Sequence, residues 1–517
     1  MNADDRALLA DALELALVLH PDTDRAATVL ARAITELGHP AAALRRLDQH
    51  VARQPADATA WLDRAQAQRA QGDREGALSS VDRALALAPD RSDALANRTL
   101  LLRELRRWNE VHASLQHQLS VDPDNARALA DDGQALLSLG RPDDALRPFD
   151  RAIALQPDLA DAHAGRATAM NELDRLHEAL TSLQRLREIG AADAGTAWNE
   201  ALIHLALGDF RRGLPRFEER WNLTAAISNR PNFQPPLWLG ETPVAGRTIL
   251  LVSEQGLGDS LQFCRYAPML ARRGATVLLS VPRPLVRLMR TLDGVSRVMA
   301  EDETPPPFDV YCPLMSLPLA FDTVLETIPG DTPYLHADPA AVAAWHARLE
   351  AHPGLRVGLV WAGNPRPDEP DLHAIDGRRS LSLSQFTPLA AIPGVTIISL
   401  QKINAGAQVQ PPSPGLSLID WTDELTDFAD TAALVAALDL VISVDTSVVH
   451  LTGALGKPVW ILDRFAGCWR WLRSRADSPW YPTARLFRQS VRTDWRPVIA
   501  AITGALAVHA AARADAR

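Results

Sequence analysis

The sequence predicts an α-solenoid of paired helices over residues 1–225, followed by an α/β region of two lobes. Three observations predict this. Proline, glycine and alanine recur at a fixed interval in the first half. Short apolar segments that suit parallel strands alternate with helical segments in the second half. The 517 residues are also too many for a single core, so more than one domain is expected.

The repeat is carried by three residue types in one register. Pro21, Pro55, Pro89, Pro123 and Pro157 are 34 residues apart, and four of them are followed directly by Asp. The same step relates Gly38, Gly72, Arg106, Gly140, Asp174 and Gly208, and the Ala-Leu pairs at 43, 77, 145 and 179 keep it too. This period is the signature of tetratricopeptide repeats, in which proline ends the second helix and glycine marks the turn. Arg106 and Asp174 at the glycine position predict two looser turns.

The register gives about six repeats between residues 23 and 221, with Met1–His20 as a capping helix. The last repeat contains Trp198 and ends in RFEERWNL, which is atypical. Terminal repeats are atypical because one of their sides faces something other than a repeat. We expect an array at 1–225, a proline-rich linker at 226–246, a first lobe at 247–337, and a second lobe with a closing C-terminal helix at 338–517.

The second half alternates strands and helices. Apolar strands are expected at 248–254, 275–281, 295–301, 356–363, 396–401, 440–445 and 458–463, with helical segments between most of them. Two such sheets in tandem occur in paired dinucleotide folds, in periplasmic-type binding proteins and in two-lobed glycosyltransferases. In all three, the ligand lies at the carboxyl ends of the strands.

Composition excludes several function classes. A net charge of -10 argues against nucleic acid as the main partner. Cys264, Cys312 and Cys468 show neither zinc-ligand spacing nor a disulfide framework. The N-terminal segment lacks a basic region before its apolar part, and no 18-residue uncharged apolar stretch occurs, so we expect no membrane span and a cytoplasmic protein.

The first motif is EQGLGDS at 254–260, which follows a strand and opens a helix. Gly256 and Gly258 allow a tight turn, and the free N–H groups of the helix suit an anion. The motif is not GxGxxG and lacks a P-loop lysine, so a nicotinamide cofactor has little support and we expect no cofactor. A plain strand–helix turn would look the same.

The second motif, SVDTSVVHL at 443–451, also joins a strand to a helix. Asp445, Thr446 and Ser447 are natural helix caps, but the same residues with free helix N–H groups also suit a diphosphate. His450 follows in the first turn, where it is either structural or beside the ligand.

Two further strand ends carry polar residues. Asn364 follows WAG and is followed downstream by Arg379, while Gln401 and Lys402 close the SLQK segment. Arg379 and Lys402 would neutralise a departing diphosphate, although each alone would also suit a solvated surface. No DxD pair stands out at a strand end, so we expect no metal.

These four motifs resemble bacterial tetratricopeptide proteins with a heptosyltransferase-like domain of glycosyltransferase family 9. The resemblance covers about residues 246–490, including RWLRSRADSPWYPTARLFRQ, and implies a GT-B domain of two Rossmann-like lobes. The layout is also similar to the O-linked N-acetylglucosamine transferases and to flagellin-modifying glycosyltransferases. Between Asn364 and Arg378, the chain carries an acidic segment, PRPDEPDLHAIDG, that we expect to be a loop.

The resemblance implies metal-independent, inverting transfer of a sugar from a nucleotide-sugar to a protein hydroxyl, with flagellin among the acceptors it suggests. It makes Asp259 the catalytic base, and Glu254 and His450 are the next candidates. The resemblance makes the Asp445–Ser447 turn and Lys402 contacts of the donor diphosphate. With the motifs above, the expected donor-binding residues are Gly256, Gly258, Asn364, Arg379, Gln401, Lys402, Asp445, Thr446, Ser447 and His450. Two other functions remain open: a catalytically silent scaffold, and a transferase for a glycolipid or lipopolysaccharide core, which the acidic balance disfavours.

Overall fold

The computed structural model describes residues 31–223, 230–402 and 416–515. The expected capping helix at Met1–His20 lies outside these ranges. By its contacts the chain divides into two compact units, an N-terminal unit of Met1–Ala191 and a C-terminal unit of Ala192–Arg517.

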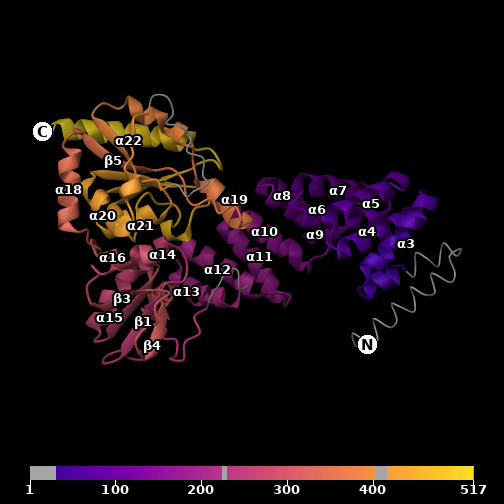
Figure 1. Cartoon of the computed structure of the whole chain (residues 1–517), viewed down its shortest axis with the longest axis horizontal. Helices are drawn as coiled ribbons and strands as arrows, with labels where there is room; N and C mark the ends of the chain where they lie inside the picture. The colour runs from indigo at the N-terminus through magenta and orange to yellow at the C-terminus, as the bar shows by residue number, and fades with distance from the viewer. Residues whose placement is uncertain (1–30, 224–229, 403–415, 516–517) are drawn as a thin grey trace. The chain divides into compact units, whose positions relative to one another are not determined.

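The described part of the N-terminal unit is a series of paired helices (Figure 1). Pro55, Pro89, Pro123 and Pro157 each lie between the second helix of one pair and the first helix of the next, which confirms the repeat solenoid. The helices are α3 (Pro40–Arg53), α4 (Ala58–Ala70), α5 (Arg74–Leu87), α6 (Ser92–Glu104), α7 (Trp108–Val121), α8 (Ala126–Ser138), α9 (Pro142–Leu155), α10 (Ala160–Glu172) and α11 (Leu176–Glu188).

The turns inside the pairs all have one conformation. Arg106 and Asp174 have φ of 56° and 59°, in the left-handed region that Gly72 and Gly140 also occupy. The residue after the turn position makes the same hydrogen bond in both kinds of turn. The N–H of Arg107 donates to the carbonyl of Leu102 at 2.9 Å, and the N–H of Asp73 donates to the carbonyl of Gln68 at 3.0 Å. The prediction of looser turns is therefore wrong, since the geometry is kept and two non-glycine residues adopt it under strain.

The C-terminal unit begins with the last helix pair, α12 (Ala194–Ala206) and α13 (Phe210–Phe217), followed by the short helix η1 (Glu218–Asn222). Phe210 lies 6.2 Å, between ring centroids, from both Trp469 and Trp480, and Phe217 lies 6.1 Å from Trp469. This pair packs on aromatic residues of the α/β region, which explains its atypical sequence.

The segment expected as a linker packs along the edge of the first sheet. The N–H of Trp238 donates to the carbonyl of Tyr311 at 2.8 Å, and the N–H of Tyr311 donates to Pro236 at 3.1 Å. Phe233 packs edge-on against both Tyr311 and Phe308.

The first sheet has four parallel strands in the order β3-β2-β1-β4. The expected strands are present, and the sequence analysis missed β4. The helical segment between β1 and β2 is divided into α14, a 3-10 turn and α15, and its Leu261, Tyr266 and Leu270 are fully buried. The bounds are β1 (Thr248–Val252), β2 (Thr276–Val281), β3 (Val295–Ala300), β4 (Val310–Pro313), α14 (Leu257–Phe263), α15 (Ala267–Arg272), α16 (Val286–Met289) and α17 (Leu317–Ala320).

The second sheet has six parallel strands in the order β10-β9-β8-β5-β6-β7, which read in chain order is the 3-2-1-4-5-6 arrangement of Rossmann folds. β7 and β10 were not predicted. The bounds are β5 (Leu355–Val360), β6 (Val395–Ser399), β7 (Leu418–Ile419), β8 (Leu440–Val444), β9 (Val459–Asp463), β10 (Ala484–Arg488), α18 (Pro339–Leu349), α19 (Pro370–Arg379), α20 (Phe428–Ala437), α21 (Ser447–Ala454) and α22 (Arg496–Asp515).

The C-terminal helix α22 packs on this second sheet (Figure 1). Its Val498, Ile499, Ile502 and Leu506 are buried in the same apolar core as the strand residues. Within the ranges that the structure describes, α22 is also the one helix whose length and composition would suffice to cross a membrane.

Candidate functional site

The strand order of the two parallel sheets reverses between β1 and β4 and between β5 and β8, which is where α/β proteins bind ligands. The helices that follow β1 and β8, α14 and α21, contact each other at their first turns. A Cβ added to Gly258 would lie 2.8 Å from Cδ2 of His450 and 3.4 Å from Cα of Ser447. Gly258 therefore allows the close approach of the two helix ends, and the structure brings the first and second motifs together.

Asp259 lies at this junction as the third residue of α14. Its Oδ2 accepts the N–H of Gly256 at 2.9 Å, and Gly256 is the helix N-cap. Its Oδ1 pairs with the guanidinium of Arg470, on the 3-10 turn η8 (Trp469–Trp471) that precedes β10. The Asp259 side chain is 20% exposed. Asp259 is therefore not the N-cap itself, but it supports the cap and remains accessible.

The first turn of α21 lacks a side-chain cap. Thr446 occupies the N-cap position, but its hydroxyl bonds no helix N–H and lies 3.1 Å from the Ser443 hydroxyl instead. The leading N–H groups of α21 thus have no side-chain acceptor, which suits the binding of an anion.

Arg379 connects two of the predicted strand ends. Its Nη1 donates to the carbonyl of Asp445 and its Nε to Oδ1 of Asp376, both at 2.9 Å. Gly363 fits tightly against this pair, since a Cβ there would lie 2.4 Å from Nη2 of Arg379. Asn364 and Arg379 therefore lie with Asp445 at the ends of β5 and β8. The acidic segment expected as a loop is helical from Pro370 onward, where it forms the start of α19, and this helix supplies both Asp376 and Arg379.

Gln401 and Lys402 follow β6. The Oε1 of Gln401 accepts the N–H groups of Trp361 at 3.1 Å and Ala362 at 2.8 Å, which ties the end of β6 to the end of β5. The Nζ of Lys402 donates to the carbonyl of Leu425. The structure thus gives Gln401 a supporting role, and a phosphate contact by Lys402 stays a prediction.

His450 is covered by aromatic side chains. Its ring stacks on Trp471 at 5.4 Å, and its Nδ1 lies 3.0 Å from the hydroxyl of Tyr481. Burial, with the nearby charges of Arg470 and Arg265, holds the pKa of His450 well below its usual 6.5. The ring is neutral at pH 7, and we assign it to the packing of α21 against α14.

Glu254, the other next candidate for the base, is in a buried ion pair. Arg220 on η1 reaches its two oxygens at 2.7 and 3.0 Å, and both side chains are at most 3% exposed. Burial raises the pKa of Glu254 even beside Arg220. The pair attaches the last helix pair to the end of β1, so we assign Glu254 a structural role.

Arg470 is the site residue that the sequence analysis missed, although it stands in the quoted segment RWLRSRADSPWYPTARLFRQ. It is 8% exposed, and its Nε donates to Oε1 of Gln262 at 2.8 Å. Burial opposes its charge, but the carboxylates of Asp259 and Asp445 and the thiol of Cys468 outweigh this and hold the pKa of Arg470 above its usual value.

Asp463, at the end of β9, was also missed. Its Oδ2 lies 2.7 Å from Nε of Arg488, while Oδ1 is buried with no partner among the residues described. Burial raises the pKa of Asp463 from 3.8 to about 6. Arg488 also donates to the carbonyls of Trp471 and Leu472, at 3.3 and 3.0 Å, and so fixes the segment that carries Arg470.

Metal and thiol chemistry have few candidate residues. Cys264, Cys312 and Cys468 are free thiols. Over residues 31–223, 230–402 and 416–515, no three or more His, Cys, Asp or Glu side chains gather in a way that could hold a metal ion.

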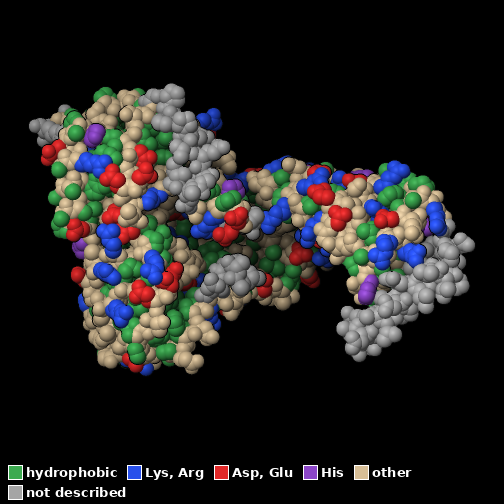
Figure 2. All heavy atoms as spheres, viewed as in Figure 1, with side chains coloured by type: hydrophobic (Ala, Val, Ile, Leu, Met, Phe, Trp, Pro, Cys, Tyr) green, Lys and Arg blue, Asp and Glu red, His purple; other side chains and the backbone are tan. Residues whose placement is uncertain are grey.

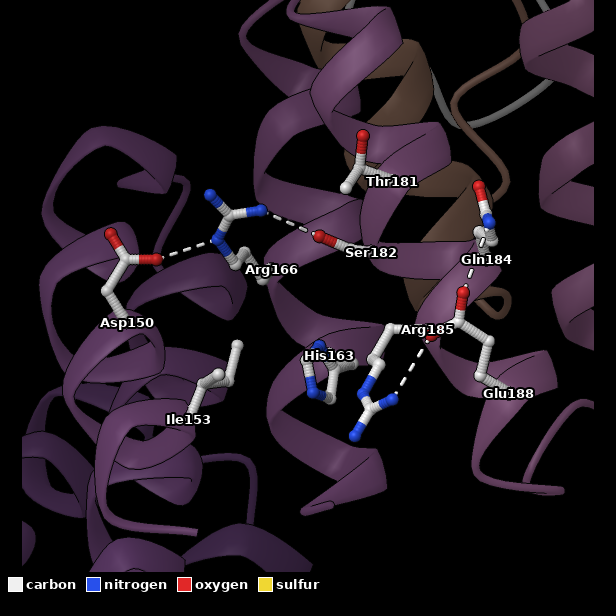
Figure 3. A pocket seen from close by; sticks show the side chains of 9 residues that line it. All are labelled: Asp150, Ile153, His163, Arg166, Thr181, Ser182, Gln184, Arg185 and Glu188. Carbon is white, nitrogen blue, oxygen red and sulfur yellow. Dashed lines mark hydrogen bonds and ion pairs between the residues drawn. The ribbon is translucent and has the colours of Figure 1, made fainter. Parts of the chain in front are cut away.

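The N-terminal unit has an open pocket of about 380 Å³ between α9, α10 and α11 (Figure 3). Arg166 lies between Asp150, at 2.7 Å, and the hydroxyl of Ser182, at 2.8 Å. The visible face of the array likewise mixes acidic and basic side chains (Figure 2). The pocket is lined by Asp150, Ile153, His163, Arg166, Thr181, Ser182, Gln184, Arg185 and Glu188.

Comparison with known proteins shows a similarity to a curated protein. The chain is 30% identical to Protein FlbA of Caulobacter vibrioides over 337 residues, which are 60% of this chain and 54% of FlbA. The chain thus spans about half the length of this relative. No model of a known protein family matches.

Similar solved structures are repeat proteins. A MamA double mutant (RS-1) is 19% identical with a TM-score of 0.31, over 33% of this chain and 95% of its own. A tetratricopeptide repeat protein from Parabacteroides merdae is 20% identical with a TM-score of 0.34, over 43% and 90%. YrrB, a tetratricopeptide protein with an unusual peptide-binding site, is 18% identical with a TM-score of 0.30, over 34% and 92%.

Proposed function

We propose that the C-terminal unit is a GT-B glycosyltransferase that moves a sugar from a nucleotide-sugar to a hydroxyl group of a protein. One observation carries the proposal. Where the helices after β1 and β8 meet, an accessible carboxylate, Asp259, faces a buried cation, Arg470, beside the uncapped first turn of α21. A base, a cation and free N–H groups are what transfer from a diphosphate requires.

The donor diphosphate would lie at the first turn of α21. The N–H groups at Ser447 and the following residue would bond its oxygens, with the helix dipole favouring their negative charge. Asn364 and Arg379 would line the same edge of the second sheet, and Gly256 and Gly258 would line the first.

The reaction is a direct displacement at the anomeric carbon. The acceptor oxygen forms a bond to this carbon while the bond to the diphosphate oxygen breaks, and the nucleoside diphosphate leaves with the electron pair. The acceptor proton passes to Oδ1 of Asp259, and the anomeric configuration inverts. Asp259 suits this role because its side chain is partly exposed, whereas Glu254 and His450 are covered.

Asp259→Asn tests this role. Asparagine can still accept the N–H of Gly256 through its amide oxygen, but it leaves the buried guanidinium of Arg470 without its acidic partner. The melting temperature should therefore fall, and the rates are compared at a temperature where both proteins are folded. Loss of a general base should lower the rate about 10²–10⁴-fold. The measurement is release of nucleoside diphosphate from a panel of nucleotide-sugars in the presence of candidate acceptor proteins, flagellin included. Asp477→Asn is the control, because Asp477 is an exposed acid of the same unit, paired with Arg475.

Equal release by the parent and by Asp259→Asn would remove Asp259 as the base. Release by neither protein, with any donor and acceptor tested, would contradict the transferase proposal and favour a scaffold.

The repeat array would hold the acceptor protein. Its paired helices and mixed-charge surface suit a polypeptide better than a small anion (Figures 2 and 3). Binding the acceptor on the same chain would raise its concentration near the transferase unit.

A further inference from the structure

We propose that Arg470 is the cation that binds the donor diphosphate, and that a bound diphosphate draws it away from Asp259 and frees that carboxylate to act as the base. The inference rests on the proposed function and adds to it a residue and an order of events.

Arg470 lies between the two parts of the site. Its Nη2 pairs with Asp259 on α14, and its Nε bonds Gln262 on the same helix at 2.8 Å, while Arg470 itself belongs to the segment between β9 and β10. The carboxylate of Asp445, beside the first turn of α21, is also close enough to favour its charge. A phosphate at that turn would therefore lie next to the guanidinium.

The two cations that the sequence analysis proposed are held by other groups. Arg379 pairs with the carboxylate of Asp376 at 2.9 Å and bonds the carbonyl of Asp445. Lys402 bonds the carbonyl of Leu425. Arg470 instead has as its acidic partner the proposed base itself.

Two residues that adjoin Arg470, Gln262 and Trp471, each carry a buried N–H group without an acceptor among the described residues. The Nε2 of Gln262 and the Nε1 of Trp471 are buried, and neither has a hydrogen-bond partner in the part of the chain that the structure describes. Both residues are fully covered, and Gln262 is the residue whose Oε1 holds Arg470. Such N–H groups beside a guanidinium suit an anion with several acceptor oxygens.

The backbone that presents Arg470 is strained. Leu472 has φ 54° and ψ -167°, a conformation that non-glycine residues avoid. Arg488 holds it there through bonds to the carbonyls of Trp471 and Leu472, and Asp463 in turn holds Arg488. Two buried or half-buried side chains, Arg488 and Asp463, thus fix the segment from which Arg470 projects.

The exchange has a simple electrostatic basis. Asp259 offers Arg470 one negative charge, and one of its two oxygens already accepts the Gly256 N–H. A diphosphate offers more charge and more acceptor oxygens, and guanidinium groups bind phosphates in a bidentate manner. Asp259 and the diphosphate should therefore compete for Arg470.

A double-mutant cycle in the full chain tests this competition. The probes are UDP, GDP, ADP and CDP, titrated calorimetrically to find the one that the parent binds most tightly. Arg470→Gln should weaken its binding about 10- to 100-fold. Asp259→Asn should tighten it about 3- to 10-fold, because the competitor for Arg470 is removed. In the Arg470→Gln background, Asp259→Asn should have no effect.

Arg265→Gln is the matched control. Arg265 is also buried, and it likewise connects the α14 region to the β9–β10 segment, because it donates to the carbonyl of Trp480. Its hydrogen-bond acceptors are all neutral oxygens. Its replacement should lower the melting temperature and leave binding of the probe unchanged. If Arg470→Gln does not fold, Arg470→Lys takes its place in the cycle, because lysine keeps the positive charge but loses the two-point geometry of the guanidinium.

Three results would overturn the inference. The first is unchanged nucleotide binding by Arg470→Gln, and the second is unchanged or weaker binding by Asp259→Asn. The third is tighter binding by Asp259→Asn that persists in the Arg470→Gln background, because this would indicate simple charge repulsion. Failure of the parent to bind any of the four nucleotides would overturn the proposed function as well. The first three results would leave it standing.

Discussion

The pair between Glu254 and Arg220 should be the most sensitive ion pair in the C-terminal unit. Both side chains are at most 3% exposed, and Glu218 and Ser316 complete the network around the guanidinium. Glu254→Gln leaves the charge of Arg220 buried with half its acidic partners, and removing one member of a buried pair costs about 3–5 kcal/mol. In a unit of this size, such a loss corresponds to a fall in melting temperature of roughly 4–7 °C.

Tryptophan fluorescence during thermal and urea unfolding of the full chain measures this loss. Of the tryptophans, Trp61 and Trp108 precede residue 192 and the rest lie in the C-terminal unit, so the signal reports mainly on that unit. Glu424→Gln is the control, because Arg348 bonds Glu424 in the same two-point geometry, at 2.6 and 2.7 Å, with both side chains at least 40% exposed. The control should lose much less stability, because solvent screens an exposed ion pair. Equal losses from the two variants would refute the role of burial.

Two further predictions concern the turns and the pH dependence. Arg106→Gly and Asp174→Gly should each stabilise the array by up to about 1 kcal/mol in urea unfolding followed by circular dichroism, since glycine adopts their left-handed φ without strain. The control Gln134→Gly, at an exposed position in the middle of α8, should instead destabilise the array. If all three glycine variants destabilise the array, the left-handed turns at Arg106 and Asp174 are not strained. Asp463 has a folded pKa of about 6 against 3.8 for the free group, so its carboxyl contributes stability below about pH 4 that is lost as the pH rises through 6. The stability of the parent relative to Asp463→Asn should accordingly fall by on the order of 3 kcal/mol between pH 4 and pH 7, and a constant difference would show that burial does not raise this pKa.

The array could be predicted from sequence because each repeat buries the same positions. Ala43, Ala77, Ala145 and Ala179 are all 0% exposed, and the helix-ending prolines keep their step. The conformation at Arg106 and Asp174 could not be predicted from residue type, because the neighbouring repeats impose a turn that these residues do not favour.

The strands that were missed share a physical cause. β4 has four residues and ends in proline, β7 has two, and β10 carries exposed Arg485 within ARLFR. None of them is the continuous apolar run that marks a buried parallel strand.

The candidate site was predicted in part. The strand-end motifs come together because parallel strands place their carboxyl ends at one edge, which sequence order alone indicates. Arg470 could not be placed in this way. It comes from a short 3-10 turn, and its contact with Asp259 joins residues 211 positions apart. Its burial and its partner are known only from the fold.

The measurement that tests the central claim most directly is a thermal-shift screen of the full chain against nucleoside diphosphates, each paired with its unphosphorylated nucleoside. A ligand that binds only the folded protein at 100 times its Kd adds about 2.7 kcal/mol of stability. If a diphosphate site lies at the first turn of α21 beside Arg470, at least one nucleoside diphosphate should raise the melting temperature of the C-terminal unit, and its nucleoside should raise it much less. Equal shifts for each nucleoside and its diphosphate, or no shift for any of them, would contradict the account.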